Sequence, residues 1–176
     1  MRKNLEIKVR IKNSDKVRKL AKEFCKGKKH EALIQKQEDI YYKVGKGRLK
    51  LRIIDGKKGN LIHYYRGNKE SKRVSEYTIA ETDTPAAMDS ILSSLYGKLV
   101  TVRKTREIFI TGNIRIHIDS VNGLGKFLEF EVIFSSIAKA KKDMKKLIEY
   151  FMLDEKQFIK VSYSDLLLRK GGENAG

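Results

Sequence analysis

The first residues that could do chemistry lie in one short segment near the start of the chain, Asn4-Leu5-Glu6-Ile7-Lys8-Val9-Arg10. Polar and charged side chains alternate there with apolar ones, which is the period-two pattern of a β-strand with one apolar and one charged face. The charged face carries a carboxylate and two cations, groups that bind metal ions and anions respectively. The segment therefore predicts a strand that contributes polar ligands to a site.

The same alternation recurs further along the chain, so several strands present a charged face. The recurring sets are Arg48, Lys50 and Arg52; Lys104 and Arg106; Arg115, His117 and Asp119; and Glu129 and Glu131. If such strands close around a lumen, a lining of like charges is too costly to keep dry, so an anion or water must fill it. Cations combined with carboxylates that can hold a divalent metal are the parts needed to clamp a triphosphate.

Size and composition indicate one heavily charged domain. The chain has 176 residues, of which 40% are hydrophobic and 35% charged, and its formal net charge of +17 implies an anionic partner. No apolar run approaches the roughly 18 residues of a membrane helix, and the first residues lack the apolar region of a signal peptide. The single Cys25 lies on an apolar helical face and is expected in the core of a protein from a reducing compartment. We therefore expect a cytoplasmic protein with no membrane partner.

Local patterns predict an α+β fold with many short strands. Strands are expected over 4–12, 33–44, 48–54, 61–66, 73–81, 99–103, 106–111, 114–119 and 127–134. Helical spacing predicts helices over 14–25, 84–97 and 137–151, with short helical turns ending near Leu168. Gly-containing turns between successive strands indicate an antiparallel meander, and closure would remove its exposed edges. The predicted architecture is a single-domain eight-stranded antiparallel β-barrel with helices packed outside.

An ordered set of short motifs resembles the CYTH superfamily, also called triphosphate tunnel metalloenzymes, and within it the class IV adenylyl cyclase branch. The motifs are Asn4-x-Glu6-x-Lys8, Gln37-x-Asp39-x-Tyr41-Tyr42, Gly47-Arg48-Leu49-Lys50-Leu51-Arg52, Tyr64-Tyr65-Arg66, Arg73-x-Ser75-x-Tyr77, Lys104-x-Arg106, His117-Ile118-Asp119, Phe127-Leu128-Glu129-x-Glu131 and Ser162-Tyr163-x-Asp165. The resemblance assigns residues 1–170 to one CYTH-like tunnel domain and leaves 171–176 as a tail expected to be disordered. Asn4 stands where the family signature has a carboxylate, which puts one of the family's two metal positions in doubt.

The resemblance also implies roles for individual residues. It implies a triphosphate bound in the tunnel with Mg²⁺ or Mn²⁺. The phosphate-binding residues would be Lys8, Arg10, Lys50, Arg52, Arg66, Arg73, Lys104 and Arg106. The metal ligands would be Glu6, Asp119, Glu129 and Glu131, and the catalytic residues Glu6, Lys8, Lys104 and Glu129. Arg48, Arg115 and His117 share the inward parity and are further candidates.

Three functions are compatible with these residues. The resemblance favours a cyclase, in which the 3′-hydroxyl of ATP attacks the α-phosphorus and releases pyrophosphate. The alternative is a triphosphatase acting on inorganic triphosphate, thiamine triphosphate or a nucleoside triphosphate, and a second alternative is a non-catalytic polyphosphate or nucleotide binder. The expected partner is ATP or another triphosphate, with a homodimer suggested by the cyclase branch. Nucleic acid is not expected, because the chain lacks zinc-finger spacing and an aromatic RNA-binding signature.

Overall fold

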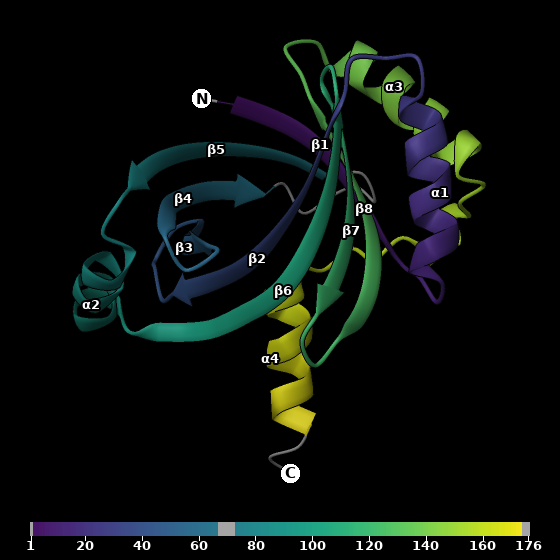
Figure 1. The fold of residues 1–176 in the computed structure, drawn as a ribbon. Coiled ribbons are helices and arrows are strands. Elements are labelled where there is room, and N and C mark those ends of the chain that lie inside the picture. The colour runs from purple at the N-terminus through teal and green to yellow at the C-terminus, as the bar shows by residue number, and fades with distance from the viewer. Residues whose placement is uncertain (1, 67–72, 174–176) are drawn as a thin grey trace.

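In the computed structural model, which describes residues 2–66 and 73–173, eight antiparallel strands close into one barrel (Figure 1). The strands are β1 (Arg2–Arg10), β2 (Glu31–Tyr42), β3 (Arg48–Ile54), β4 (Lys58–Arg66), β5 (Arg73–Thr82), β6 (Lys98–Thr111), β7 (Ile114–Val121) and β8 (Gly125–Ile133). Around the barrel their order is β1-β5-β4-β3-β2-β6-β7-β8. The predicted architecture is confirmed, and each strand has a hydrogen-bonded neighbour on both sides.

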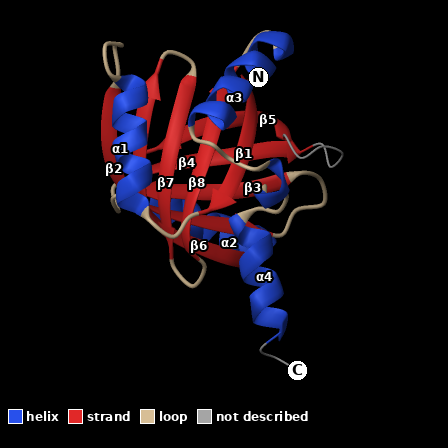
Figure 2. Ribbon diagram, turned by 90° about the vertical axis from the view of Figure 1, so that its right-hand side faces the viewer, coloured by secondary structure: helices blue, strands red, loops and turns tan. Residues whose placement is uncertain are grey.

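Helices cover parts of the outer surface (Figure 2). They are α1 (Ser14–Cys25), α2 (Pro85–Tyr96), α3 (Ile137–Tyr150) and α4 (Tyr163–Glu173), with the 3₁₀ turn η1 (Glu155–Gln157) between the last two. The start of α1 is capped as its sequence predicts, because the Asn13 side chain accepts a 3.0 Å hydrogen bond from the Lys16 backbone N–H. Pro85 is the first residue of α2, a position where its missing N–H costs nothing. In the described ranges no helix is both long and apolar enough to cross a bilayer.

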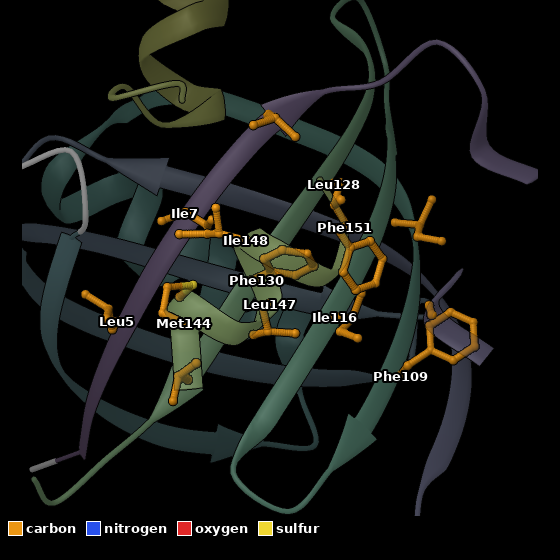
Figure 3. Packing of buried hydrophobic residues seen from close by; sticks show 14 of the residues in the cluster. Leu5, Ile7, Phe109, Ile116, Leu128, Phe130, Met144, Leu147, Ile148 and Phe151 are labelled. Carbon is orange, nitrogen blue, oxygen red and sulfur yellow. The ribbon is translucent and has the colours of Figure 1, made fainter. Parts of the chain in front are cut away.

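The main hydrophobic core lies between the barrel wall and the helices α1 and α3. Its side chains come from the outward faces of β1, β7 and β8, including Leu5, Ile116 and Phe130, which are at most 1% exposed. Met144 and Leu147 of α3 pack onto them (Figure 3). Because side chains alternate along a strand, burying these outward faces turns the intervening charged residues toward the barrel interior. The fold therefore has its apolar core outside the barrel and its polar groups inside.

Most strand boundaries differ from the sequence prediction by one to three residues, and two differences are larger. The segments 99–103 and 106–111 form one continuous strand, β6, because the polar residues at its centre alternate between the two faces. Arg103 points outward to Glu38 with an Nη2–Oε1 distance of 2.7 Å, whereas Lys104 points inward. Helix α4 runs to Glu173, past the end predicted near Leu168, and 174–176 lie outside the described residues.

Candidate active site

A cavity of about 170 Å³ lies inside the barrel, with lining side chains from all eight strands. Its cations are Lys8, Lys50, Arg52, Lys104, Arg106 and Arg115, and its carboxylates are Glu6, Asp39, Glu129 and Glu131. The cavity thus carries a modest positive excess that favours an anionic ligand. Most of the formal charge of +17 lies elsewhere on the molecule.

Asp39 on β2 is the centre of the first charge cluster and is only 2% exposed. Its Oδ1 accepts a 2.7 Å hydrogen bond from Arg52 Nε, and its Oδ2 accepts one of 2.8 Å from Arg52 Nη2. The same Oδ2 accepts from Lys50 Nζ at 3.0 Å and from Lys104 Nζ at 2.8 Å. Burial alone would raise the pKa of Asp39, but the three cations hold it well below its usual range. One carboxylate facing three cations leaves this part of the cavity positive.

Glu129 on β8 is the centre of the second charge cluster. Its Oε2 lies 2.8 Å from Lys8 Nζ, and its Oε1 accepts a 2.9 Å hydrogen bond from Arg106 Nη2 and lies 3.1 Å from His117 Nδ1. Burial opposes ionisation of Glu129, yet Lys8 and Arg106 hold the pKa of this carboxyl well below its usual range. Arg106 also donates two hydrogen bonds of 2.6 Å to Asp119, which is fully buried. Asp119 therefore fixes the orientation of the Arg106 guanidinium that donates to Glu129.

The oxygen atoms of β1 and β8 suit a hard divalent cation. Glu6 and Glu131 are register partners on these adjacent strands, and Asn4 Nδ2 donates a 2.5 Å hydrogen bond to Glu131 Oε1. The Asn4 Oδ1 atom is buried and has no hydrogen-bond partner among the described residues. An unpaired carbonyl oxygen beside two carboxylates is a position that a bound cation would satisfy. The described residues contain no complete cluster of three acidic, His or Cys ligands, so substrate or water oxygens would complete the coordination.

Lys104 is a cation of the inner cavity whose pKa lies near neutrality. Burial lowers the pKa of Lys104 to about 7, the Asp39 carboxylate opposes this, and Arg52, Arg106 and Lys50 lower it further. Its side chain is fully buried, and its ammonium bonds to Asp39 at 2.8 Å. Lys104 can therefore gain or lose a proton near neutral pH inside the cavity.

A wider cavity of about 520 Å³ adjoins the first and shares Arg52, Arg106 and Glu131 with it. Its lining combines apolar and amide or hydroxyl side chains: Leu33, Ile54, Ile79, Ile108, Ile110, Gln35, Gln37, Asn60 and Thr78. Gln37 donates to Gln35 Oε1 at 2.7 Å, but the buried Gln37 Oε1 has no partner among the described residues. This second cavity, the mouth, can hold an organic group with polar edges.

The C-terminal segment fills the opposite part of the barrel. Tyr163 packs edge-on against Phe127 with ring centroids 4.9 Å apart, and its hydroxyl donates a 2.8 Å hydrogen bond to Asp119. Next to it, Ser162 accepts a 2.7 Å hydrogen bond from Arg48 Nη1. In Figure 1 this segment, in yellow, crosses the view of β7 and β8 and leads into α4. The candidate site is therefore covered by the tail at one end and continuous with the mouth at the other.

Most of the residues predicted as a site share the inner cavity. Those that line it are Glu6, Lys8, Lys50, Arg52, Lys104, Arg106, Glu129 and Glu131. Arg10 is exposed, and its Nη1 donates a 2.6 Å hydrogen bond to the Leu124 carbonyl. The side chains of Arg66 and Arg73 lie outside the described part of the structure, although their backbones belong to β4 and β5.

Of the three further candidates from the sequence, two lie at the cavities and one lies at the C-terminal segment. Arg115 lines both cavities, and His117 lies between Glu129 and Glu131, with its Nε2 3.8 Å from Glu131 Oε2. Arg48 points to the tail, where its Nη2 donates a 3.0 Å hydrogen bond to Asp165.

Asp39 and Tyr163 are the site residues that the sequence prediction missed. Both occur in the motifs quoted above, but neither was assigned a role. The available signal was parity, since Asp39 alternates with Gln37 and Tyr41 on the inward face of β2. For Tyr163 parity offers no signal, because it lies at the start of a helix and reaches the site through tertiary packing.

Comparison with known proteins agrees with this fold. A curated Methanocaldococcus jannaschii protein, provisionally named adenylate cyclase, is 30% identical over 172 residues, which are 92% of this chain and 97% of the relative. A Pyrococcus horikoshii OT3 structure is 23% identical with a TM-score of 0.81, covering 93% of this chain and 98% of the other.

A Hippeastrum protein structure, described as a provisional adenylyl cyclase with a dominant triphosphatase activity, is 14% identical with a TM-score of 0.63. It covers 98% of this chain and 96% of its own. The family model described as CYTH domain matches residues 2–163. With that match over most of its length, the chain belongs to the CYTH domain family.

Proposed function

We propose that this protein is a metal-dependent adenylyl cyclase that converts ATP to cyclic AMP and pyrophosphate inside the barrel. The supporting observation is that one cavity combines the cations around Asp39 with the carboxylates Glu6, Glu129 and Glu131. Cations can neutralise the phosphate oxygens while the carboxylates hold Mg²⁺ or Mn²⁺, which is the division of labour that phosphoryl chemistry requires.

The mouth supports a nucleoside triphosphate over an inorganic one. Its apolar side chains could pack on the faces of a base and a ribose, and the amides of Gln35, Gln37 and Asn60 could meet polar edges. The mouth shares Arg52 and Arg106 with the inner cavity, so a ligand could span both. The adenylate cyclase name of the Methanocaldococcus relative favours ATP among such ligands.

The side chains that line the cavity would have separate roles in the cyclase reaction. Glu6, Glu131 and Asn4 Oδ1 would hold a divalent ion, with substrate or water oxygens completing its coordination, and the ion would neutralise phosphate charge. Lys8, Lys50, Arg52, Lys104 and Arg106 would bind the phosphate oxygens. The ribose 3′-hydroxyl attacks the α-phosphorus, the bond to the bridging oxygen breaks, and its electron pair leaves with pyrophosphate. The hydroxyl proton passes to water in the cavity, and Lys104 remains an ammonium on the phosphate oxygens.

Product analysis with ATP and Mn²⁺ tests this function. Cyclic AMP and pyrophosphate in equal amounts are expected, and formation should fall at least about 100-fold in a Glu129→Ala, Glu131→Ala variant. The surface variant Glu38→Gln is the control. If ADP and phosphate are the only products, the cyclase proposal is wrong.

Hydrolysis is the second candidate, because the same cations and carboxylates could position water against the terminal phosphorus. The dominant triphosphatase activity described for the Hippeastrum protein supports considering it. Consumption of inorganic triphosphate much faster than ATP would favour this reaction. Tight triphosphate binding without any turnover, unaffected by the two Glu→Ala changes, would instead indicate a non-catalytic binder.

A further inference from the structure

Asp39 places one protein carboxylate at the point where three candidate phosphate-binding cations meet. Arg52, Lys50 and Lys104 come from two strands, β3 and β6, and donate four hydrogen bonds of 2.7–3.0 Å to its two oxygens. Asp39 lies between them on β2, which pairs with both strands. The described cluster thus gathers three basic side chains around one carboxylate in a nearly water-free position.

Without that carboxylate, mutual repulsion would drive the three cations apart. Like charges at this depth repel strongly, since burial weakens the screening that water provides at the surface. A phosphoryl group offers the same features as Asp39, namely negative oxygens that accept two parallel Arg hydrogen bonds and further Lys hydrogen bonds. The cluster is therefore arranged for an anion before any ligand arrives.

We propose that Asp39 is a positioning residue that stands in for a phosphoryl group in the ligand-free protein, keeping Lys50, Arg52 and Lys104 converged until the substrate triphosphate shares them. This inference rests on the proposed function, because it takes a triphosphate as the incoming anion. It assigns Asp39 no contact with the reacting atoms. It predicts that a bound triphosphate can replace much of what Asp39 contributes to stability.

Thermal unfolding with and without sodium tripolyphosphate tests the proposal. The measurement uses the full chain in EDTA at constant ionic strength, so that metal binding and general salt effects do not contribute. The test variant is Asp39→Asn, which removes the charge and keeps the shape. The matched control is Glu38→Gln, which removes the same charge from the adjacent residue, whose ion pair with Arg103 lies on the outer surface.

Without anion, Asp39→Asn should unfold about 5–15 °C below the wild type, because a buried partner is lost. Glu38→Gln should stay within about 2 °C of the wild type. Tripolyphosphate at about 100 times its Kd should raise the midpoint of the wild type by about 5–10 °C. The rise in Asp39→Asn should be larger by at least about 5 °C, since the anion also restores the missing negative charge.

An unchanged midpoint in ligand-free Asp39→Asn overturns the proposal, and so does a rise with tripolyphosphate that is no larger than in the wild type. The second result would mean that Asp39 is only structural. If the wild type does not respond to tripolyphosphate in EDTA, this inference fails, and if it also does not respond when Mn²⁺ replaces EDTA, the proposed function fails with it. A response in the wild type with no difference in the variant overturns the Asp39 inference alone.

A second variant covers the case in which Asp39→Asn does not fold. Asp39→Asn combined with Lys104→Met removes one cation together with the carboxylate, so less unbalanced charge remains. This double variant should fold, unfold at a higher temperature than Asp39→Asn, and still gain stability from tripolyphosphate. A double variant that is no more stable than the single one would contradict the proposal.

Discussion

The Tyr163 hydroxyl donates a 2.8 Å hydrogen bond to the Asp119 carboxylate, and this bond connects the C-terminal segment to the barrel interior. Asp119 holds the guanidinium of Arg106, which in turn donates to Glu129. Burial, followed by the charges of Asp119 and Glu129, raises the pKa of Tyr163 well above its usual range. The phenol is therefore a hydrogen-bond donor at every physiological pH.

Tyr163→Phe should lower the free energy of unfolding by about 1 kcal/mol, because Asp119 loses one buried donor while Arg106 remains bound. Urea denaturation measures the change. Tyr150→Phe on α3 is the control, since Tyr150 is 39% exposed and its loss of a hydroxyl should have little effect. Equal stability of the two variants would mean that the tail is not coupled to the interior through this bond.

Arg52 and Arg10 should differ sharply in their contribution to anion binding, although the family resemblance assigns phosphate to both. Arg52→Met should weaken tripolyphosphate binding at least about tenfold, since the guanidinium lines the cavity and charge-assisted hydrogen bonds are strong. Arg10→Met should change the affinity less than about threefold, because Arg10 is exposed and bonds to the Leu124 carbonyl. Titration calorimetry compares them directly, and similar losses would show that Arg10 reaches the ligand.

Asn4→Asp should tighten Mn²⁺ binding by restoring a negative oxygen donor beside Glu6 and Glu131. Without metal the same change should lower stability, because the Asn4 Nδ2 hydrogen bond to Glu131 is replaced by repulsion between carboxylates. Unfolding midpoints with and without Mn²⁺ provide both readings, and Asn113→Asp in the β6–β7 turn is a control outside the cavity. A midpoint that responds to Mn²⁺ as it does in the wild type would argue against a metal at Asn4.

Lys104 should make stability increase with pH above neutrality. Its pKa is about 7 in the folded protein, well below its ordinary value of 10.5, so between these values the unfolded chain binds more protons than the folded one. The free energy of unfolding should therefore rise by about 1 kcal/mol per pH unit through this group. Below pH 7 both states are protonated and the contribution becomes constant.

The comparison of wild type with Lys104→Met isolates that contribution, because other titrating groups are common to both proteins. Urea denaturation at pH 7.5, 8.25 and 9 should show the wild type gaining about 1–2 kcal/mol relative to the variant across the series. Parallel pH profiles would contradict a depressed pKa at Lys104.

Local sequence patterns were sufficient to predict the strands and which side chains share a charged face. The alternation in β1, β3 and β8 follows from side chains that point to opposite sides of a strand, so parity placed Glu6, Lys50 and Glu129 on charged faces, and their inward direction followed from the expected closure with helices outside. Helix caps and the Pro85 start likewise depend on neighbouring residues. The division of the central polar stretch of β6 into two strands was wrong, since polar residues on both faces resemble a turn when read locally.

Tertiary structure decided which charges meet. Asp39 and Lys104 are 65 residues apart, and their contact depends on the pairing of β2 with β6 and on its register. The family resemblance that implied Asp119 as a metal ligand could not show that Arg106 and Tyr163 occupy its oxygens. Sequence determines which side of a strand a residue faces because that depends on local geometry. The partner that it finds there depends on barrel closure and register, which the whole chain sets together.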